Sequence, residues 1–240
     1  MNEQQINSLL LYRDGLILVL DKPAGIACHQ GPSGGDYIEK YFNHLQFGLP
    51  NPPSLAHRLD RDTSGCLVLG RHRKALAKLG KLFSSNQIKK KYWAICHGKP
   101  ENPEGTINAA LLKVNTKRGW RIVIDNEKGQ ESITDYKLLG YDPATNLSWI
   151  EAAPQTGRTH QIRIHLKHLG CPIVGDPFYN HHRRDDEIIK AGTIESEGEE
   201  QLHLHARSVE IPISQNKPAI FIEAPPPEHM LEKLKLLGMK

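Results

Sequence analysis

A run of charged side chains stands directly before a short apolar segment of the chain. The run covers residues 56–65, and Asp60 lies within it between two arginines. Neighbouring cations favour the ionised form of a carboxyl group, and an ionised carboxylate beside a strand can act as a nucleophile or a general base. A simple turn is the alternative, because residues 62–65 are typical turn formers. The residues alone do not decide between Asp60 and Asp62 as the reactive carboxylate.

A second polar segment, residues 155–165, combines a glycine with cationic side chains. A helix that begins near Thr159 would carry His160 and Arg163 on one face and apolar side chains on the other. The glycine relaxes the backbone and a helix N-terminus attracts anions, so a phosphate or carboxylate could bind there. An ordinary amphipathic helix with a polar outer face explains the same pattern equally well.

A third segment places Tyr92 at the start of an apolar run, directly after three lysines. A half-buried strand tyrosine is the common case, but a tyrosine there could also stack on a base or move a proton. The lysines belong to a stretch, residues 63–100, that contains no Asp or Glu. Such a stretch favours a polyanionic partner, because neutralised phosphates release counterions. A solvated helix face is the alternative.

Metal, redox and membrane functions find little support in the sequence. The 13 histidines motivate a metal-dependent hydrolase as a competing hypothesis, but His160 and His165 do not have the spacing of a zinc-binding helix. The four cysteines form no close pair, which favours a reducing cytoplasm over a disulfide framework. The longest apolar runs are far shorter than the roughly 20 residues that span a bilayer. We therefore expect no metal site and no membrane contact.

Hydrophobic periodicity predicts more strands than helices along the 240 residues. Strands are expected at residues 15–20, 66–69, 92–96, 121–124, 132–138, 148–152 and 202–211. Helices are expected at residues 36–45, 74–85, 159–169 and 228–237. Because strand and helix do not alternate regularly, the sequence predicts an α+β protein with a mixed sheet.

The polar segments together resemble the RluA-type family of RNA pseudouridine synthases. Residues 57–65 are similar to the family's HRLDxxTSG motif, residues 90–94 to KxYxA, and residues 157–165 to GRTHQIRxH. Three further segments fit in the family's order, namely residues 21–25 (DKPxG), 175–179 (GDxxY) and 202–206 (LxLHA). The resemblance runs from about residue 16 to about residue 225. It implies the pseudouridine synthase fold, which is α+β with a mixed, mainly antiparallel sheet, flanking helices and a central active-site cleft.

The resemblance also implies a reaction, the isomerisation of specific uridines in RNA to pseudouridine without a metal or a cofactor. The uridine must leave the stack, because a stacked base hides its glycosidic bond. By resemblance, Asp60 is the catalytic carboxylate, which attacks the sugar or assists glycal formation. Arg163 is its ion-pair partner, and Tyr92 packs against the target base.

The resemblance further assigns a set of substrate-binding residues, of which Arg58 would fill the gap left by the flipped uridine. The set is His57, Arg58, Arg61, Thr63, Arg158, His160 and Gln161. Ribosomal RNA, transfer RNA or both would be the partner of a single catalytic domain, residues 1–240, without an S4-type RNA-binding domain. We expect a cytoplasmic monomer with an acidic surface loop near residues 183–200. A non-catalytic RNA-binding module of the same fold is the alternative.

Overall fold

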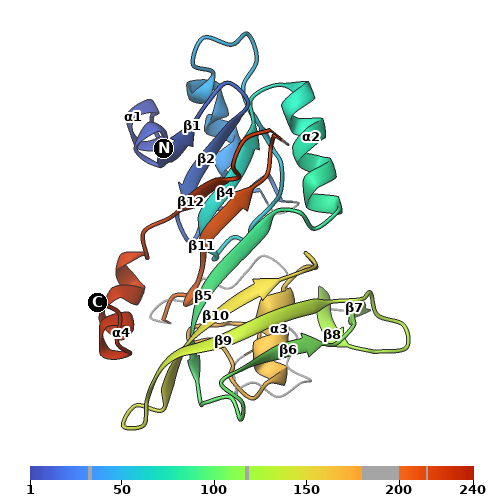
Figure 1. Ribbon diagram of the computed structural model, residues 1–240, viewed down its shortest axis with the longest axis vertical. Helices are drawn as coiled ribbons and strands as arrows, with labels where there is room; N and C mark the ends of the chain where they lie inside the picture. The colour runs from blue at the N-terminus through green and yellow to red at the C-terminus, as the bar shows by residue number, and fades with distance from the viewer. Residues whose placement is uncertain (32–33, 117–118, 180–199, 215) are drawn as a thin grey trace. The chain divides into compact units, whose positions relative to one another are not determined.

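The computed structural model describes residues 1–31, 34–116, 119–179, 200–214 and 216–240 (Figure 1). The chain divides into two compact units. Unit 1 comprises Met1–Lys91 and His205–Pro227, and unit 2 comprises Tyr92–Leu204 and Glu228–Lys240. The single catalytic domain stays a prediction. Residues 183–199 of the expected acidic loop lie outside the described residues.

Unit 1 is built on a sheet whose central strand is β4. The strands are β1 (Leu10–Arg13), β2 (Ile17–Lys22), β3 (Ser54–Leu55), β4 (Ser64–Gly70), β11 (Leu204–Ile211) and β12 (Ile220–Glu223). Their order is β1-β2-β4-β11, and off this path β12 pairs with β11 and β3 pairs with β4. Only the β4–β11 pair is parallel among the pairs described in this unit. Every residue of β4 is buried, which explains its continuous apolar character.

Three helical segments accompany this sheet, namely α1 (Glu3–Ser8), the 3₁₀ helix η1 (Ile38–Leu45) and α2 (Arg73–Ser84). The imidazole of His72 caps α2 by accepting a hydrogen bond from the N–H of Ala75 at 3.3 Å. Ala75, Leu79 and Leu82 are the buried residues of α2. The charged residues on the opposite side are all cationic, namely the exposed Arg73, Lys74, Lys78 and Lys81.

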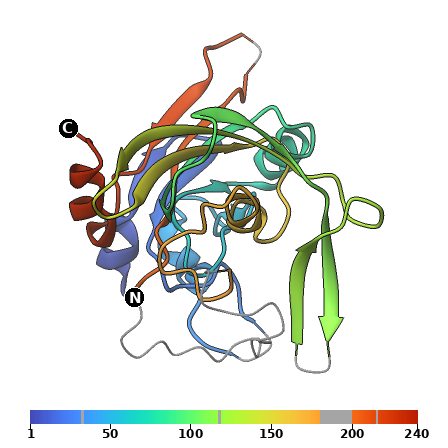
Figure 2. The ribbon, with the colours of Figure 1, turned by 90° about the horizontal axis from the view of Figure 1, so that it is seen from below.

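Unit 2 contains an antiparallel sheet in the order β5-β10-β9-β6. Its strands are β5 (Lys89–His97), β6 (Glu104–Asn108), β9 (Ile133–Asp142) and β10 (Leu147–Pro154). A hairpin of β7 (Leu111–Thr116) and β8 (Gly119–Ile124) stands apart as a second sheet (Figure 2). The helices of this unit are α3 (Gln161–His168) and α4 (Glu228–Leu236).

Successive apolar side chains along the strands of unit 2 point to opposite faces of the sheet. They therefore belong to two apolar clusters, one on each face. Ala94 and Ile150 share one cluster with Leu166 of α3. Ile95 shares the other with Met230 of α4. The strands curve around α3, which lies on their concave side (Figure 2). The predicted α+β class with a mixed, mainly antiparallel sheet is therefore confirmed, while the central cleft stays a prediction.

Candidate active site

A buried lysine fixes the backbone on one side of Asp60. The ammonium of Lys22, at the end of β2, donates hydrogen bonds to the carbonyls of Pro23 at 2.8 Å, Ile26 at 2.9 Å and Arg61 at 2.9 Å. Burial lowers the pKa of Lys22 to about 8, although nearby carboxylates such as Asp60 oppose the shift. At neutral pH the group is therefore an ammonium, with three donors for three carbonyls.

A buried cysteine holds the backbone on the other side of Asp60. The Sγ of Cys28 accepts a hydrogen bond from the N–H of Leu59 at 3.4 Å and donates one to the Leu59 carbonyl at 3.3 Å. The carbonyl of Asp60 accepts from the N–H of Thr63 at 3.2 Å, which closes a turn. Asp60 is thus placed through the backbone of its neighbours, and the two sequence motifs at residues 21–25 and 57–65 lie side by side.

Strand β11 fixes the end of the same loop. The hydroxyl of Ser64 lies 2.9 Å from Nδ1 of His205, whose Nε2 faces the carbonyl of Ala224 at 3.3 Å. Because a carbonyl only accepts, Nε2 carries the proton and Nδ1 accepts from Ser64. Gly65 has φ +102°, and a Cβ there would overlap the backbone of Ala206, with its nitrogen at 2.9 Å. The close approach of the two strands therefore requires glycine at this position.

The first residue of the motif, His57, anchors the loop to β4. Its Nε2 accepts a hydrogen bond from the N–H of Val68 at 3.0 Å, and its ring lies 4.7 Å from that of Phe83 on α2. Burial lowers the pKa of His57 to about 3, so the ring is neutral at pH 7. The structure thus gives this imidazole an internal partner. The predicted contact of His57 with substrate stays a prediction.

The neutral state of His57 predicts an acid-sensitive contribution to stability. The folded-state pKa of about 3 lies below the ordinary 6.5, so the unfolded chain binds more protons between these pH values. The free energy of unfolding therefore falls as the pH drops through this range, by up to ~1.4 kcal/mol per pH unit. We expect His57→Gln to give a flatter curve of stability against pH in urea denaturation between pH 7 and pH 4. His168→Gln, at an exposed position, is the control, and an unchanged slope in His57→Gln would contradict this assignment.

The remaining predicted residues of unit 1 lie around the same loop. Arg58 is exposed, and its Nη1 lies 3.3 Å from Nε2 of His29. The exposed Arg61 pairs with Asp62 at 3.0 Å. Thr63 is buried, with an exposed fraction of 3%. Two arginines therefore stand at the surface beside Asp60, where an RNA phosphate could reach them.

In unit 2, α3 is buried on all sides near its start. The helix begins at Gln161, and the preceding His160 adopts a left-handed conformation with φ 54° and no side-chain cap. Residues 161–166 are all buried. An amphipathic helix with a polar outer face is therefore wrong, because the polar side chains of α3 have partners inside the protein.

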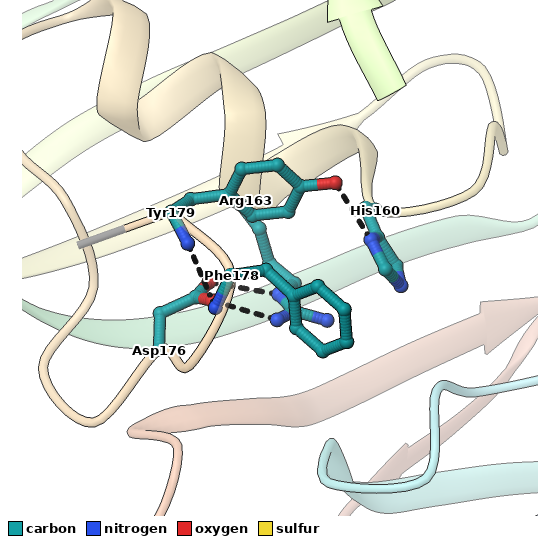
Figure 3. Close-up of polar contacts among 5 residues, drawn as sticks. All are labelled: His160, Arg163, Asp176, Phe178 and Tyr179. Atoms are coloured by element: carbon teal, nitrogen blue, oxygen red, sulfur yellow. Dashed lines mark hydrogen bonds and ion pairs between the residues drawn. The ribbon is translucent and has the colours of Figure 1, made fainter. Parts of the chain in front are cut away.

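The guanidinium of Arg163 is held by a buried carboxylate (Figure 3). Its Nε donates to Oδ2 of Asp176 at 2.8 Å and its Nη2 to Oδ1 at 2.6 Å. The same Oδ1 accepts from the N–H groups of Phe178 at 2.8 Å and Tyr179 at 3.1 Å. Burial disfavours ionisation of Asp176, but the charge of Arg163 and these hydrogen bonds outweigh it and lower the pKa of the carboxyl.

Aromatic rings enclose the same guanidinium. Its central carbon lies 4.9 Å from the ring centroid of Phe178 and 5.2 Å from that of Tyr179. The hydroxyl of Tyr179 is 2.8 Å from Nδ1 of His160, so the two side chains lie together as drawn in Figure 3. The ion pair with Asp176 uses the Nε–Nη2 edge of Arg163.

The other predicted residues of unit 2 have separate surroundings. Tyr92 is half-buried on β5, opposite Ala152 of β10, and packs on the apolar cluster beneath α3. Arg158 is exposed, and its Nε donates to the carbonyl of Glu131 at 3.2 Å. Gln161 has an exposed fraction of 3% and uses its amide on internal partners. The pairing of Asp60 with Arg163 stays a prediction.

Four residues that shape these sites were not predicted from the sequence. They are Lys22, Cys28, Asp176 and His205, each with side-chain hydrogen bonds to the Asp60 loop or to Arg163. Three of them stood in recognised motifs. Among the described residues, no group of three or more His, Cys, Asp or Glu side chains is placed to hold a metal ion. No helix in these parts of the chain has the length and apolar character of a membrane crossing.

Comparisons with known proteins agree on one family. A family model described as RNA pseudouridylate synthase matches residues 16–168. An uncharacterized RNA pseudouridine synthase of Zymomonas mobilis is 43% identical over 221 residues, which cover 91% of this chain and 94% of that protein. A ribosomal large subunit pseudouridine synthase C of Buchnera aphidicola is 37% identical over 227 residues, covering 91% of this chain and 67% of the relative.

The fold comparison points the same way. The solved structure of human RNA pseudouridylate synthase domain containing 4 has a TM-score of 0.76 and 27% sequence identity, and the match covers 97% of this chain and 95% of that one. The family match covers more than half of the chain, and the motifs and the fold agree with it. This chain therefore belongs to the RNA pseudouridylate synthase family, and it is an isomerase that acts on RNA.

Proposed function

We propose that this protein converts specific uridines of ribosomal RNA, transfer RNA or both to pseudouridine, with Asp60 as the catalytic carboxylate. The observation that carries the proposal is the way three distant segments fix the backbone around Asp60. Lys22 holds the Arg61 carbonyl, Cys28 holds Leu59, and His205 holds Ser64. Such preorganisation is expected of a group that must meet a reacting atom within a few tenths of an ångström.

The proposed reaction begins when the target uridine leaves its stack, at a cost of a few kcal/mol. The carboxylate of Asp60 either attacks C1′ or removes a proton from C2′ to give a glycal, and the bond from C1′ to N1 breaks. The uracil turns, and a bond forms from C5 to C1′ as the ester bond from C1′ to Asp60 breaks or, in the glycal route, as Asp60 returns the proton to C2′. C5 then loses its proton and N1 gains one, so the overall change is an isomerisation. In this scheme Tyr92 packs against the base and can take the C5 proton.

Arg163 is the proposed partner that keeps Asp60 ionised and aimed. An arginine binds carboxylates through the edges of its planar fork, and Asp176 occupies the Nε–Nη2 edge. The rings of Phe178 and Tyr179 restrict the plane of the guanidinium. A second carboxylate, that of Asp60, would bind at the remaining edge, and His160 and Arg158 would approach the RNA from the same segment of unit 2.

The choice of RNA and of compartment rests on indirect support. The Buchnera relative is named for the large ribosomal subunit, which supports ribosomal RNA as the substrate class. All four cysteines are free and buried, which supports a reducing compartment such as the cytoplasm. The monomeric state stays a prediction.

The direct test is tritium release from RNA that carries [5-³H]uridine, because only replacement of the C5 hydrogen frees the label. We expect the purified protein to release tritium from ribosomal RNA or transfer RNA, also after exhaustive chelation of metal ions. Binding of both RNAs without release would favour the non-catalytic module. Pseudouridine maps of cellular RNA with and without this protein would then identify the sites.

The cationic side of α2 is the proposed contact for RNA phosphates. We expect the triple variant Lys74→Glu, Lys78→Glu, Lys81→Glu to bind RNA more weakly and with less dependence on salt. For single-stranded RNA the slope of log K against log salt should decrease by about 2, at ~0.7 per lost contact. The control with equal charge change is Lys128→Glu, Lys137→Glu, Lys235→Glu, at exposed positions of unit 2. Equal slopes in the two triple variants would show that α2 is not the contact.

A further inference from the structure

A buried hydrogen-bond network joins α3 to β9 in unit 2. We infer that Thr134, Gln161 and His165 are positioning residues for Arg163, which act by fixing the rotation of α3 about its axis. The consequence for catalysis rests on the proposed function, whereas the effect on Arg163 does not. None of the three side chains is available at the surface, since their exposed fractions are 0%, 3% and 0%.

Gln161 uses every hydrogen-bonding group of its amide. Its Nε2 donates to the carbonyl of Ile133 at 2.9 Å and to Oγ1 of Thr134 at 2.9 Å. Its Oε1 accepts from the hydroxyl of Thr156 at 2.8 Å and from the N–H of Arg158 at 3.0 Å. Two donors and two acceptors are thus satisfied, which fixes the orientation of the amide.

The network continues through one hydroxyl to His165. Oγ1 of Thr134 lies 2.9 Å from Nδ1 of His165, whose Nε2 lies 3.0 Å from the carbonyl of Ala109. Because the carbonyl accepts, Nε2 carries the proton, Nδ1 accepts from Thr134, and Thr134 accepts from Gln161. Burial lowers the pKa of His165, in agreement with a neutral ring. Every direction in the chain is therefore determined, and a fully satisfied buried network gives rigidity.

The place of the network on α3 explains why it would control Arg163. Gln161 and His165 are one turn apart on the same face, and Arg163 lies between them in sequence. The helix has 8 residues and its first turn has no side-chain cap at His160, so the network adds directional contacts to the apolar packing of Ile162, Ile164 and Leu166. A small rotation would move the end of the long arginine side chain most. Its contacts of 2.6 and 2.8 Å to Asp176 tolerate only a few tenths of an ångström.

The test removes the shared hydroxyl with little change of shape, in Thr134→Val. The first measurement is hydrogen exchange of the Arg163 Nε–H by ¹⁵N NMR, with the signal assigned by its loss in Arg163→Lys. We expect exchange at least tenfold faster in Thr134→Val than in the wild type. Thr134→Ser keeps the hydroxyl and should restore the wild-type rate. The control is His168→Ala, an exposed position on the same helix.

The second measurement is turnover, at a temperature where all variants are folded. We expect kcat for tritium release to fall at least tenfold in Thr134→Val, with the Kd for RNA changed less than twofold, and to recover in Thr134→Ser. If Thr134→Val does not fold, Gln161→Met tests the same network from its other end. A lower melting temperature with wild-type exchange of Arg163 would overturn the inference. Absence of tritium release in the wild type would refute the proposed function instead, and the exchange measurement would still decide the network.

Discussion

Asp60→Asn is expected to abolish pseudouridine formation while the protein remains folded and still binds RNA. Asparagine has nearly the same size, but it carries no charge and cannot serve as a nucleophile or a base. Loss of a catalytic nucleophile commonly lowers kcat by several orders of magnitude, so we expect a decrease of at least ~10³-fold in tritium release. The backbone contacts of Cys28 and Lys22 do not involve the Asp60 side chain, so the loop should keep its backbone position.

The matched control for this variant is Asp62→Asn in the same loop. Asp62 pairs with the exposed Arg61 at 3.0 Å, and exposed ion pairs of this kind contribute little to stability. We expect tritium release within a few-fold of the wild type. The pair of variants decides between the two carboxylates that the sequence left open. Wild-type turnover in Asp60→Asn, or loss of turnover only in Asp62→Asn, would overturn the assignment.

Asp176→Asn is expected to have the largest effect on stability and a large effect on activity. The substitution leaves the buried guanidinium of Arg163 without its carboxylate. Breaking one side of a buried ion pair typically costs ~3–5 kcal/mol. We expect a decrease of this size in the free energy of unfolding from urea titration, together with loss of most tritium release. Arg163→Ala should also lose most turnover.

Two further variants separate the effect of the buried ion pair on stability from its effect on turnover. Asp142→Asn alters a carboxylate that accepts hydrogen bonds from Thr145 in an exposed turn, and we expect a cost of about 1 kcal/mol or less. The double variant Arg163→Met, Asp176→Leu replaces the buried pair by apolar side chains, which should restore much of the stability without restoring turnover. Equal destabilisation in Asp142→Asn and Asp176→Asn would show that the buried ion pair contributes no more to the free energy of unfolding than an exposed turn does.

The long elements of the fold could be predicted from the sequence because their own residues carry the pattern. The strands around residues 66–69 and 148–152 and the helix at 74–85 appear within a few residues of the expected positions, as β4, β10 and α2. The short strands β1, β3, β6 and β12 were not predicted. Strands of two to five residues are stabilised by their neighbours, so their sequences alone carry little signal.

For the site too, features that lie within one segment could be predicted, whereas contacts between distant segments could not. The polar segments at residues 56–65 and 155–165 could be found because charged residues cluster there. The helix expected to begin near Thr159 begins at Gln161, because His160 adopts a left-handed conformation. Lys22 and Asp176 depend on partners far along the chain, and burial of a charge is not visible in a sequence. The internal hydrogen bonds of the Gln161 amide could not be predicted from the sequence either, and its predicted contact with substrate stays a prediction.

The parallel pairing of β4 with β11 has a consequence for biogenesis. Ser64 and His205 are 141 residues apart, and the whole first part of unit 2 is synthesised between them. A nascent chain that has emerged only to residue 204 carries Asp60 but lacks the strand that anchors its loop. Until translation passes that point, the edge of β4 at Ser64 and Gly65 is open to wrong partners. We therefore expect ribosome-stalled intermediates to need chaperone protection and to acquire activity late.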